Sequence, residues 1–341
     1  MTLLITGGCG FIGSNFIRYW LSKYPNDHII NLDKLTYAGN LENLKDIEND
    51  KRYTFVQGDI CDKNLLMDIT KGVDIIVHFA AESHVDRSIE GPEVFVKTNV
   101  EGTLTLLEAA LQNGAIRFHH ISTDEVFGEL PLDDPNAKFN ENTPYAPRSV
   151  YSASKASSDH LVRAYYHTHK LPITISNCSN NYGPYQFPEK LIPLAITRAI
   201  MNEEIPVYGE GTQVRDWIHV EDHCRGIELC ITKGEVGHTY LFGGNGEKQN
   251  IWIVKKILQY LNKPESLIVH VGDRKGHDLR YAIDYSRTTQ ELGYNPTKSI
   301  NDWLKDTVQW YVQNEQWWKP LKPKADIQAE KYLEKRIPSH S

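Results

Sequence analysis

Three glycines lie between an apolar run and a helical pattern near the start of the chain. The stretch LLITGGCGFIGSNFI places Gly7, Gly10 and Gly13 directly after the apolar residues 2–6. Glycines with this spacing allow a tight turn, a close approach of the backbone to a pyrophosphate, and a helix N-terminus that faces negative charge. A strand that enters such a turn and continues as a helix begins a βαβ unit, so a parallel sheet covered by helices is predicted.

Short apolar runs alternate with helical patterns over the first 180 residues. The runs are TLLIT, HIINL, YTFVQGD, DIIVHFAA, FHHIS and ITISNCS, and amphipathic stretches cover residues 11–24 and 94–112 between them. Strands that alternate with helices of this length indicate a parallel sheet. We therefore expect an α/β protein with a Rossmann-type doubly wound parallel sheet and a smaller C-terminal α/β substrate lobe.

The pattern becomes richer in loops after residue 180, and helical runs remain at 251–261 and 300–318. We expect a dinucleotide-binding domain over residues 1–180, to which some later segments return. A substrate lobe is expected over 181–320, followed by a polar C-terminal arm over 321–341 that is partly disordered.

The composition excludes several classes of protein. The chain of 341 residues is 40% hydrophobic and 24% charged, as in ordinary globular proteins, and its net charge of −7 argues against a nucleic-acid partner. Its five cysteines are scattered and form no C-x-x-C pair, which suggests neither a disulfide framework nor a zinc ribbon. No apolar run approaches the length of a membrane span. We therefore expect a cytoplasmic protein with no membrane partner.

Asp33 ends the second apolar run, twenty residues after Gly13. A carboxylate at this place can accept hydrogen bonds from both ribose hydroxyls and would repel a 2′-phosphate, which favours NAD over NADP. The alternative is an ordinary turn residue. Together with the glycines, Asp33 predicts NAD as the cofactor.

Tyr151 and Lys155 have the spacing Y-x-x-x-K in SVYSASKASSDHLV. Residues i and i+4 share one face of a helix, so the ammonium can lie near the phenol and lower its pKa. Such a tyrosine can take a proton from an alcohol that is being oxidised. Alone, the spacing is far more typical of a surface helix. After a dinucleotide-binding fold it instead indicates a catalytic pair.

At this point the chain resembles the extended short-chain dehydrogenase/reductase family, from Thr2 to about Trp318. The resemblance implies that Thr123 completes a Thr-Tyr-Lys set and hydrogen-bonds the 4-hydroxyl of a sugar. It also implies the following cofactor-binding residues: Gly7, Gly10, Phe11, Ile12, Gly13, Asp33, Lys34, Leu35, Thr36, Asp59, Ile60, Ala80, Ala81, Glu82, Thr98, Tyr151, Lys155 and Asn181.

Two adjacent acids, Asp124 and Glu125, lie in ISTDEVFG at residues 121–128. A structural interpretation is a capping box, S-x-x-E, that starts at Ser122. Oxidation or epimerisation at C4 of a sugar needs no acid pair, but dehydration does. Once C4 is a ketone, a base can remove the C5 proton and an acid can protonate the leaving C6 hydroxyl. Both roles are compatible with a helix cap.

Within this family the chain is similar to the dTDP-glucose 4,6-dehydratases. The similar blocks are STDEV, AAESHVDRSI, YSASKASSDHLVRAY, NCSNNYGPYQFPEKLIP, VYGEGTQVRDWIHVEDH and DRKGHDLRY. The resemblance implies that Asp124 is the general acid at C6 and Glu125 the general base at C5, with Tyr151 and Lys155 activating O4. We hypothesise that the neighbouring carboxylate keeps Asp124 protonated.

A dTDP-sugar substrate needs positive groups for its diphosphate, and guanidinium forks such as those of Arg215 and Arg274 suit phosphate oxygens. The resemblance implies these substrate-binding residues: Ser83, His84, Thr123, Asn180, Lys190, Leu191, Pro206, Val207, Tyr208, Arg215, Asn250, Arg274 and His277. It further implies a homodimer formed through helices that start near Val94 and Val150.

Three alternatives remain open. The first is a dehydratase of UDP- or CDP-sugars, because the base cannot be inferred from the chemistry of these residues. The second is a 4-epimerase, which the acid pair disfavours. The third is a non-catalytic NAD-binding protein, which the intact Thr123, Tyr151 and Lys155 disfavour. No metal is expected, because His119 and His120 are adjacent on a strand and lack the ligands that a metal site requires.

Overall fold

The glycine turn joins the first strand of a doubly wound sheet to the first helix that packs on it. The computed structural model describes residues 1–337, and its main sheet has seven parallel strands in the order β11-β6-β5-β4-β1-β2-β3. The strands are β1 (Thr2–Thr6), β2 (His28–Asp33), β3 (Tyr53–Gln57), β4 (Ile75–His78), β5 (Arg117–Thr123), β6 (Ile173–Cys178) and β11 (Thr239–Phe242). All six apolar runs of the first 180 residues form strands, so the predicted α/β class and parallel sheet are confirmed.

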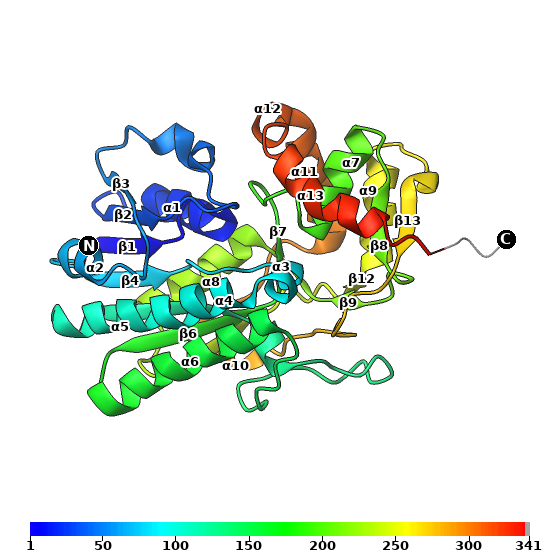
Figure 1. The fold of residues 1–341 in the computed structure, drawn as a ribbon. Helices are drawn as coiled ribbons and strands as arrows, with labels where there is room; N and C mark the ends of the chain where they lie inside the picture. The colour runs from blue at the N-terminus through cyan, green and yellow to red at the C-terminus, as the bar shows by residue number, and fades with distance from the viewer. Residues whose placement is uncertain (338–341) are drawn as a thin grey trace.

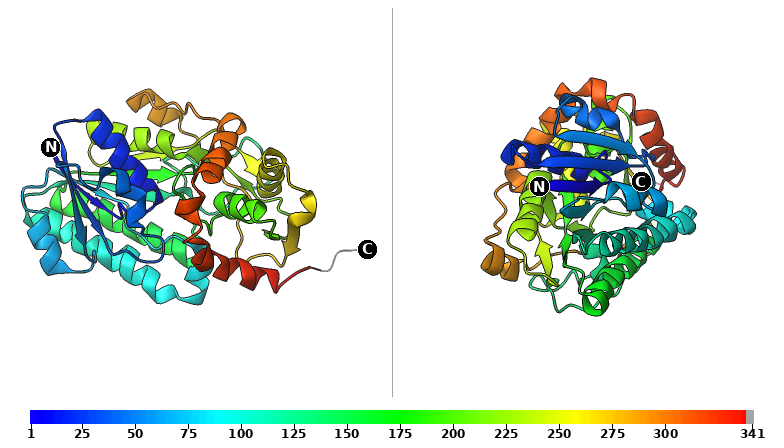
Figure 2. Two further views of the ribbon diagram at one scale, coloured as in Figure 1. Left: turned by 90° about the horizontal axis from the view of Figure 1, so that it is seen from above. Right: turned by 90° about the vertical axis from the view of Figure 1, so that its left-hand side faces the viewer.

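Helices cover both faces of this sheet (Figures 1 and 2). On one face lie α2 (Lys63–Ile69), α5 (Thr103–Gln112) and α6 (Val150–His169); on the other lie α1 (Phe11–Lys23) and α8 (Val220–Thr232). Side chains alternate along a strand, so Leu4 packs in the core of the first group while Leu3 and Ile5 pack in the core of the second. This two-sided burial explains why the strands are apolar runs without a polar face.

The second half of the chain builds a smaller lobe (Figure 1). Its core is formed largely by α7 (Leu191–Ile200), α9 (Asn250–Tyr260), α11 (Ile300–Gln313) and α12 (Glu315–Trp318). Three two-stranded sheets accompany them: β7 (Asn180–Tyr182) with β10 (Trp217–His219), β8 (Ile205–Tyr208) with β13 (Ile268–Val271), and β9 (Val214–Arg215) with β12 (Lys248–Gln249). The predicted helical run 300–318 is divided at Asn314 into α11 and α12.

Short elements connect these parts. They are η1 (Leu41–Ile47), α3 (Val85–Glu90), α4 (Pro92–Phe95), the π-helical η2 (Val96–Gly102), η3 (Asp124–Phe127), η4 (Glu265–Leu267) and α10 (Ser286–Leu292). The predicted amphipathic stretch 94–112 therefore spans α4, η2 and α5. No helix within residues 1–337 is long and apolar enough to cross a membrane.

The segment that the sequence assigns to a polar arm contains helix α13 (Lys322–Leu333). Arg198 of α7 is buried and pairs with Asp326 and Glu330 of α13, at 3.0 and 2.9 Å. The backbone N–H of Ile337 donates to His270 O at 3.0 Å. Residues 322–337 are therefore packed on the smaller lobe, and residues 338–341 of the predicted arm lie outside the described residues.

Candidate functional site

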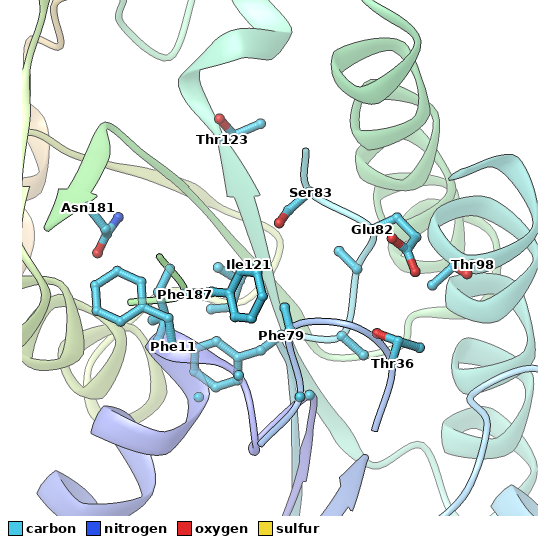
Figure 3. A pocket seen from close by; sticks show the side chains of 18 of the residues that line it. Phe11, Thr36, Phe79, Glu82, Ser83, Thr98, Ile121, Thr123, Asn181 and Phe187 are labelled. Carbon is cyan, nitrogen blue, oxygen red and sulfur yellow. The ribbon is translucent and has the colours of Figure 1, made fainter. Parts of the chain in front are cut away.

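A cavity of about 320 Å³ lies at the carboxyl ends of the parallel strands. Figure 3 shows Phe11, Asn181 and Phe187 on one side of it, and Glu82, Ser83 and Thr98 on the other. The structure brings to this one cavity all five predicted catalytic residues, the substrate residues Ser83, Asn180 and Lys190, and every predicted cofactor residue except Leu35. The predicted residues that do not line it are Leu35, His84, Leu191, Pro206, Val207, Tyr208, Arg215, Asn250, Arg274 and His277.

The glycine turn leaves no room for side chains. Gly7 has a φ of +72°, and a Cβ there would lie 2.7 Å from the backbone N and Cα of Ala80. A Cβ on Gly13 would lie 2.5 Å from Gly7 O, which would block the contact between the turn and helix α1. The backbone is therefore open to a ligand at the N-terminus of α1, as a bound pyrophosphate requires.

Asp33 lies at the end of β2 and is fixed by the backbone around it. Its Oδ2 accepts from Cys9 N at 2.9 Å, and its Oδ1 accepts from Leu35 N at 2.8 Å. Burial raises the pKa of Asp33, although these two hydrogen bonds oppose the rise. Each carboxylate oxygen keeps acceptor capacity toward the cavity, which suits a pair of ribose hydroxyls. The glycine turn and Asp33 therefore suit the binding of NAD. Leu35 contributes through its backbone N–H, which holds the Asp33 carboxylate in place.

Tyr151 and Lys155 lie on helix α6, whose start is fixed by a capping box between Ser149 and Ser152. The Lys155 ammonium donates to Ile121 O at 2.7 Å, and burial lowers its pKa to about 8. Burial and the Glu125 carboxylate raise the pKa of Tyr151 above its usual value. The predicted spacing on one helix is confirmed, but the expected lowering of the tyrosine pKa by the lysine is wrong for this environment.

The two acids begin the short helix η3, directly after β5. Thr123 is its N-cap: Oγ1 accepts from Glu125 N at 3.3 Å. The capping box predicted at Ser122 is wrong, because Ser122 is still in the strand and its hydroxyl donates to Asp159 at 2.9 Å. Asp124 and Glu125 nevertheless lie in one helical turn, so that both line the cavity.

Burial and charge distinguish the two carboxyl groups. Asp124 is 1% exposed, and burial together with Glu125 and Asp216 raises its pKa well above the usual range. Burial also raises the pKa of Glu125, but the positive charges of Arg274, Lys190 and Arg215 oppose that rise. These surroundings therefore favour the protonated form of Asp124, whereas Glu125 is more readily ionised.

The predicted basic side chains come from several distant segments. Lys190 Nζ donates to Ser83 O at 2.9 Å, at the edge of the cavity. Arg215 donates to Asp278 O at 2.8 Å and stacks on Tyr281, with 4.2 Å from its guanidinium carbon to the ring centre. Arg215 is therefore held in place beyond the cavity, with its charge directed toward the acid pair.

Another group of predicted residues lies around Asp86. The Tyr208 hydroxyl donates to Asp86 at 3.1 Å, and Arg274 lies 3.8 Å from the same carboxylate. The ring centres of Tyr208 and His277 are 5.6 Å apart, and His84 Nδ1 is 3.7 Å from Asp86. These side chains form one cluster next to the cavity. Pro206 and Val207 lie beside Tyr208 on β8, Leu191 begins α7, and Asn250 begins α9.

Thirteen lining residues are not among those predicted from the sequence. They are Leu32, Tyr37, Ala38, Gly39, Gly58, Phe79, Ile121, Ser122, Cys178, Ser179, Gln186, Phe187 and Glu189. Residues 37–39 follow the β2 carboxylate closely, and residues 186–189 lie in the block YQFPEK, so position after a strand end could have found them. Among residues 1–337, no group of three or more histidine, cysteine, aspartate or glutamate side chains could hold a metal ion.

Comparison with known proteins finds relatives that match nearly the whole chain and have the same described activity, sugar-nucleotide 4,6-dehydration. A family model described as GDP-mannose 4,6 dehydratase matches residues 4–307. A dTDP-glucose 4,6-dehydratase of Escherichia coli is 51% identical, with 93% of this chain and 95% of that protein covered.

Solved structures agree. The dTDP-glucose 4,6-dehydratase DesIV of Streptomyces venezuelae, with NAD and dTDP bound, has a TM-score of 0.91 at 50% identity, and the match covers 94% of this chain and 100% of that one. That of Bacillus anthracis strain Ames, in complex with NAD, has a TM-score of 0.87 at 47% identity over 94% and 99% of the two chains. The chain therefore belongs to the nucleotide-sugar 4,6-dehydratase family, and the predicted resemblance to dTDP-glucose 4,6-dehydratases is confirmed.

Proposed function

We propose that this chain is an NAD-dependent dTDP-glucose 4,6-dehydratase, which converts dTDP-glucose to dTDP-4-keto-6-deoxyglucose and water. The observation that carries the proposal is the acid pair, buried Asp124 and half-buried Glu125, in the same cavity as Tyr151 and Lys155. The glycine turn and Asp33 would hold the cofactor. NAD, when bound, oxidises C4 of the sugar and later reduces C6.

The protein residues supply the proton transfers. Tyr151 takes the proton of the O4 hydroxyl, while the Thr123 hydroxyl hydrogen-bonds the same oxygen and Lys155 supplies positive charge. Glu125 removes the proton at C5, which is acidic because C4 is then a carbonyl. Asp124 protonates the C6 oxygen, which leaves as water, and Glu125 returns a proton to C5.

The substrate's diphosphate and base belong to the smaller lobe in this proposal. Lys190, Arg215 and Arg274 supply positive charge near the acid pair, as their effect on the pKa of Glu125 indicates. We also propose that residues 1–180 form the cofactor domain and that residues 181–320 form the sugar-nucleotide lobe. Residues of the first part supply most of the cavity lining, which supports their role in binding the cofactor.

We further propose a cytoplasmic homodimer, and an exposed apolar surface supports the dimer. Ile89, Val94, Val96 and Leu104 are apolar and 39–48% exposed on the segment from α3 to α5. A second copy that packs on this segment would cover them. Light scattering on the purified protein tests this: a mass of one chain would exclude the dimer.

The activity is tested with dTDP-glucose, UDP-glucose and CDP-glucose in parallel, with mass spectrometry of the products. Loss of one water from dTDP-glucose in preference to the others is the expected result. Preference for another nucleotide would exclude dTDP-glucose as the substrate. A sugar that changes configuration at C4 without losing water would favour a 4-epimerase.

A further inference from the structure

The proposed reaction leaves a proton on Tyr151. The product keeps C4 as a ketone, so the proton that Tyr151 takes from O4 is never returned to the sugar. Asp124, in contrast, gives a proton to the leaving water and must regain one. After each turnover Tyr151 carries one proton too many and Asp124 one too few. The cycle therefore needs an exit for a proton from the Tyr151–Lys155 pair.

Two fully buried groups, which do not line the cavity of the sugar site, lie next to Lys155. His120 is on β5 and Asp159 is on α6, one turn beyond Lys155, and both are 0% exposed. His120 Nε2 lies 3.4 Å from Lys155 Nζ and 3.2 Å from Asp159 Oδ1. A single imidazole nitrogen thus faces both a proton donor and a carboxylate.

His120 can form a different hydrogen bond in each of its two protonation states. As a neutral acceptor, Nε2 takes a hydrogen bond from the Lys155 ammonium; once protonated, the same nitrogen donates to Asp159. Neither His120 Nδ1 nor Asp159 Oδ1 has another hydrogen-bond partner in the described range 1–337. The carboxylate oxygen is therefore free to accept from a protonated His120 Nε2.

A route continues from Asp159 to a second cavity. The other carboxylate oxygen of Asp159, Oδ2, accepts from the Tyr145 hydroxyl at 2.7 Å, and Arg163 donates to that hydroxyl, also at 2.7 Å. Tyr145, His160 and Arg163 line a cavity of about 540 Å³ that the sugar site does not share. Lys155 is thereby connected to a separate opening through three side chains.

A neighbouring histidine, His78, does not offer a competing route for the proton. His78, on β4, has its ring centre 5.3 Å from that of His120, but both its nitrogens bond to the hydroxyls of Thr6 and Thr103, at 2.7 and 3.0 Å. Burial and Lys155 lower the pKa of His120 to about 4, against the pull of Asp159. Burial would raise the pKa of Asp159, but its hydrogen bond to His120 and the charges of His120, Lys155 and Arg163 lower it. A protonated His120 or Asp159 is therefore a short-lived intermediate that gives up its proton.

We propose that His120 and Asp159 form a proton relay that removes, once per turnover, the proton that Tyr151 has taken from the sugar. This rests on the proposed function. Lys155 gives an Nζ proton to His120 Nε2 and takes the Tyr151 hydroxyl proton in its place. The imidazolium gives its proton to Asp159. The Tyr145 hydroxyl, turned toward the outer cavity, releases its own proton to solvent and takes the Asp159 proton in its place, while solvent reprotonates Asp124. One proton leaves and one enters, and no electron is transferred.

The test compares the first turnover with the steady state by rapid quench, using His120→Gln on the complete enzyme with dTDP-glucose. The first turnover is expected to stay within about twofold of the wild-type rate, because the relay acts only after Tyr151 has taken the proton from O4. The steady-state rate is expected to fall at least tenfold, so that the time course shows a burst of one product per site. Its solvent isotope effect should also rise.

His119→Gln is the matched control. His119 is adjacent on β5 and equally buried, but its ring contacts Thr174 and Ser176 of β6 and does not contact Lys155. This variant should keep the wild-type ratio of the two rates. If His120→Gln lowers both rates equally, or neither, the relay is excluded. If wild-type protein forms no dehydrated product, the proposed function fails instead.

A second variant protects the test against misfolding of His120→Gln. Tyr145→Phe removes only the hydroxyl that connects Asp159 to the outer cavity, at a half-buried position. The relay predicts a steady-state rate reduced at least threefold with an unchanged first turnover. Equal effects on both phases, or no effect on either, would contradict the relay.

Discussion

Asp124 and Glu125 are adjacent in the sequence, yet their surroundings give them different proton affinities. Burial and two neighbouring carboxylates favour a protonated Asp124, whereas three positive side chains favour an ionised Glu125. Asp124→Asn keeps the shape but cannot give a proton to the C6 oxygen. We expect elimination to slow by about 10²–10⁴-fold, while oxidation at C4 continues.

Absorbance of reduced nicotinamide after rapid mixing with dTDP-glucose measures this directly. In Asp124→Asn the signal should rise at the wild-type rate and then persist, because the later steps are blocked. Failure of the signal to form would show that Asp124 is needed for oxidation and would contradict its role as the acid at C6.

The same side chain has a predictable effect on stability. The pKa of Asp124 is raised in the folded protein, so the folded state binds more protons than the unfolded state once the pH exceeds the unfolded value. Its contribution to stability is full below that value and is lost as the pH rises toward the folded pKa. Asp124→Asn should therefore raise the free energy of unfolding at pH 7 by on the order of 1–3 kcal/mol.

Urea unfolding at pH 7 and at about pH 4 tests this, since the advantage of Asp124→Asn should shrink toward zero at the lower pH. Glu221→Gln is a suitable control, because Glu221 is exposed in the first turn of α8. An advantage that is the same at both pH values would contradict the raised pKa.

At the scale of the elements, helix α6 determines where Tyr151 and Lys155 lie. The Ser149 hydroxyl accepts from Ser152 N at 3.0 Å, and Ser152 Oγ accepts from Ser149 N at 3.0 Å. Ser149→Ala removes one of these bonds and should cost about 1 kcal/mol of stability. It should also lower kcat, because Tyr151 lies in the first turn that the cap fixes.

Ser157→Ala is the matched change in the same helix, since Ser157 is exposed and its hydroxyl donates to Ala153 O. Thermal unfolding and steady-state kinetics of both variants provide the comparison. Equal effects on stability and kcat would show that the cap has no special part in positioning Tyr151.

Element by element, the sequence predicted the sheet better than the ends of its strands. All six predicted runs form strands because apolar residues buried on both faces leave a clear signal. The end of β5 was misjudged by one residue: Ser122 resembled a cap, but it points to Asp159 and Thr123 is the cap. Which serine or threonine caps a helix depends on where the strand stops, and tertiary pairing with β6 decides that.

At the scale of the whole molecule, helix α13 joins the two lobes. Lys331 pairs with Glu90 of α3 at 3.0 Å, and the Tyr332 ring centre lies 5.0 Å from that of Tyr208 on β8. Tyr332→Ala should raise KM for dTDP-glucose several-fold, since such an aromatic pair is worth about 0.5–1.5 kcal/mol. The change in kcat should be much smaller.

Tyr260→Ala serves as control, because Tyr260 is a half-buried tyrosine of α9 that packs on the core of the smaller lobe. Steady-state kinetics with dTDP-glucose distinguish the two. A larger effect on kcat than on KM in Tyr332→Ala would contradict a role of α13 in holding the substrate side of the site.

The cluster around Asp86 shows what the sequence could not supply. Its members come from α3, β8, the loop at 273–278 and α13, and only folding brings them together. Resemblance to known enzymes named Tyr208, Arg274 and His277, but no local pattern indicates Asp86 or Tyr332. The His120–Asp159 pair was missed likewise, because a histidine on a buried strand gives no local sign of its neighbour on a helix.

Elimination of water across C5 and C6 by Glu125 and Asp124 can be tested directly in one incubation. Wild-type protein is mixed with dTDP-glucose in deuterated water, and the product is analysed by mass spectrometry and NMR. Loss of one water with one deuterium retained at C5 is the predicted result. A product that has lost water but carries no deuterium at C5, or a sugar of unchanged mass, would contradict it.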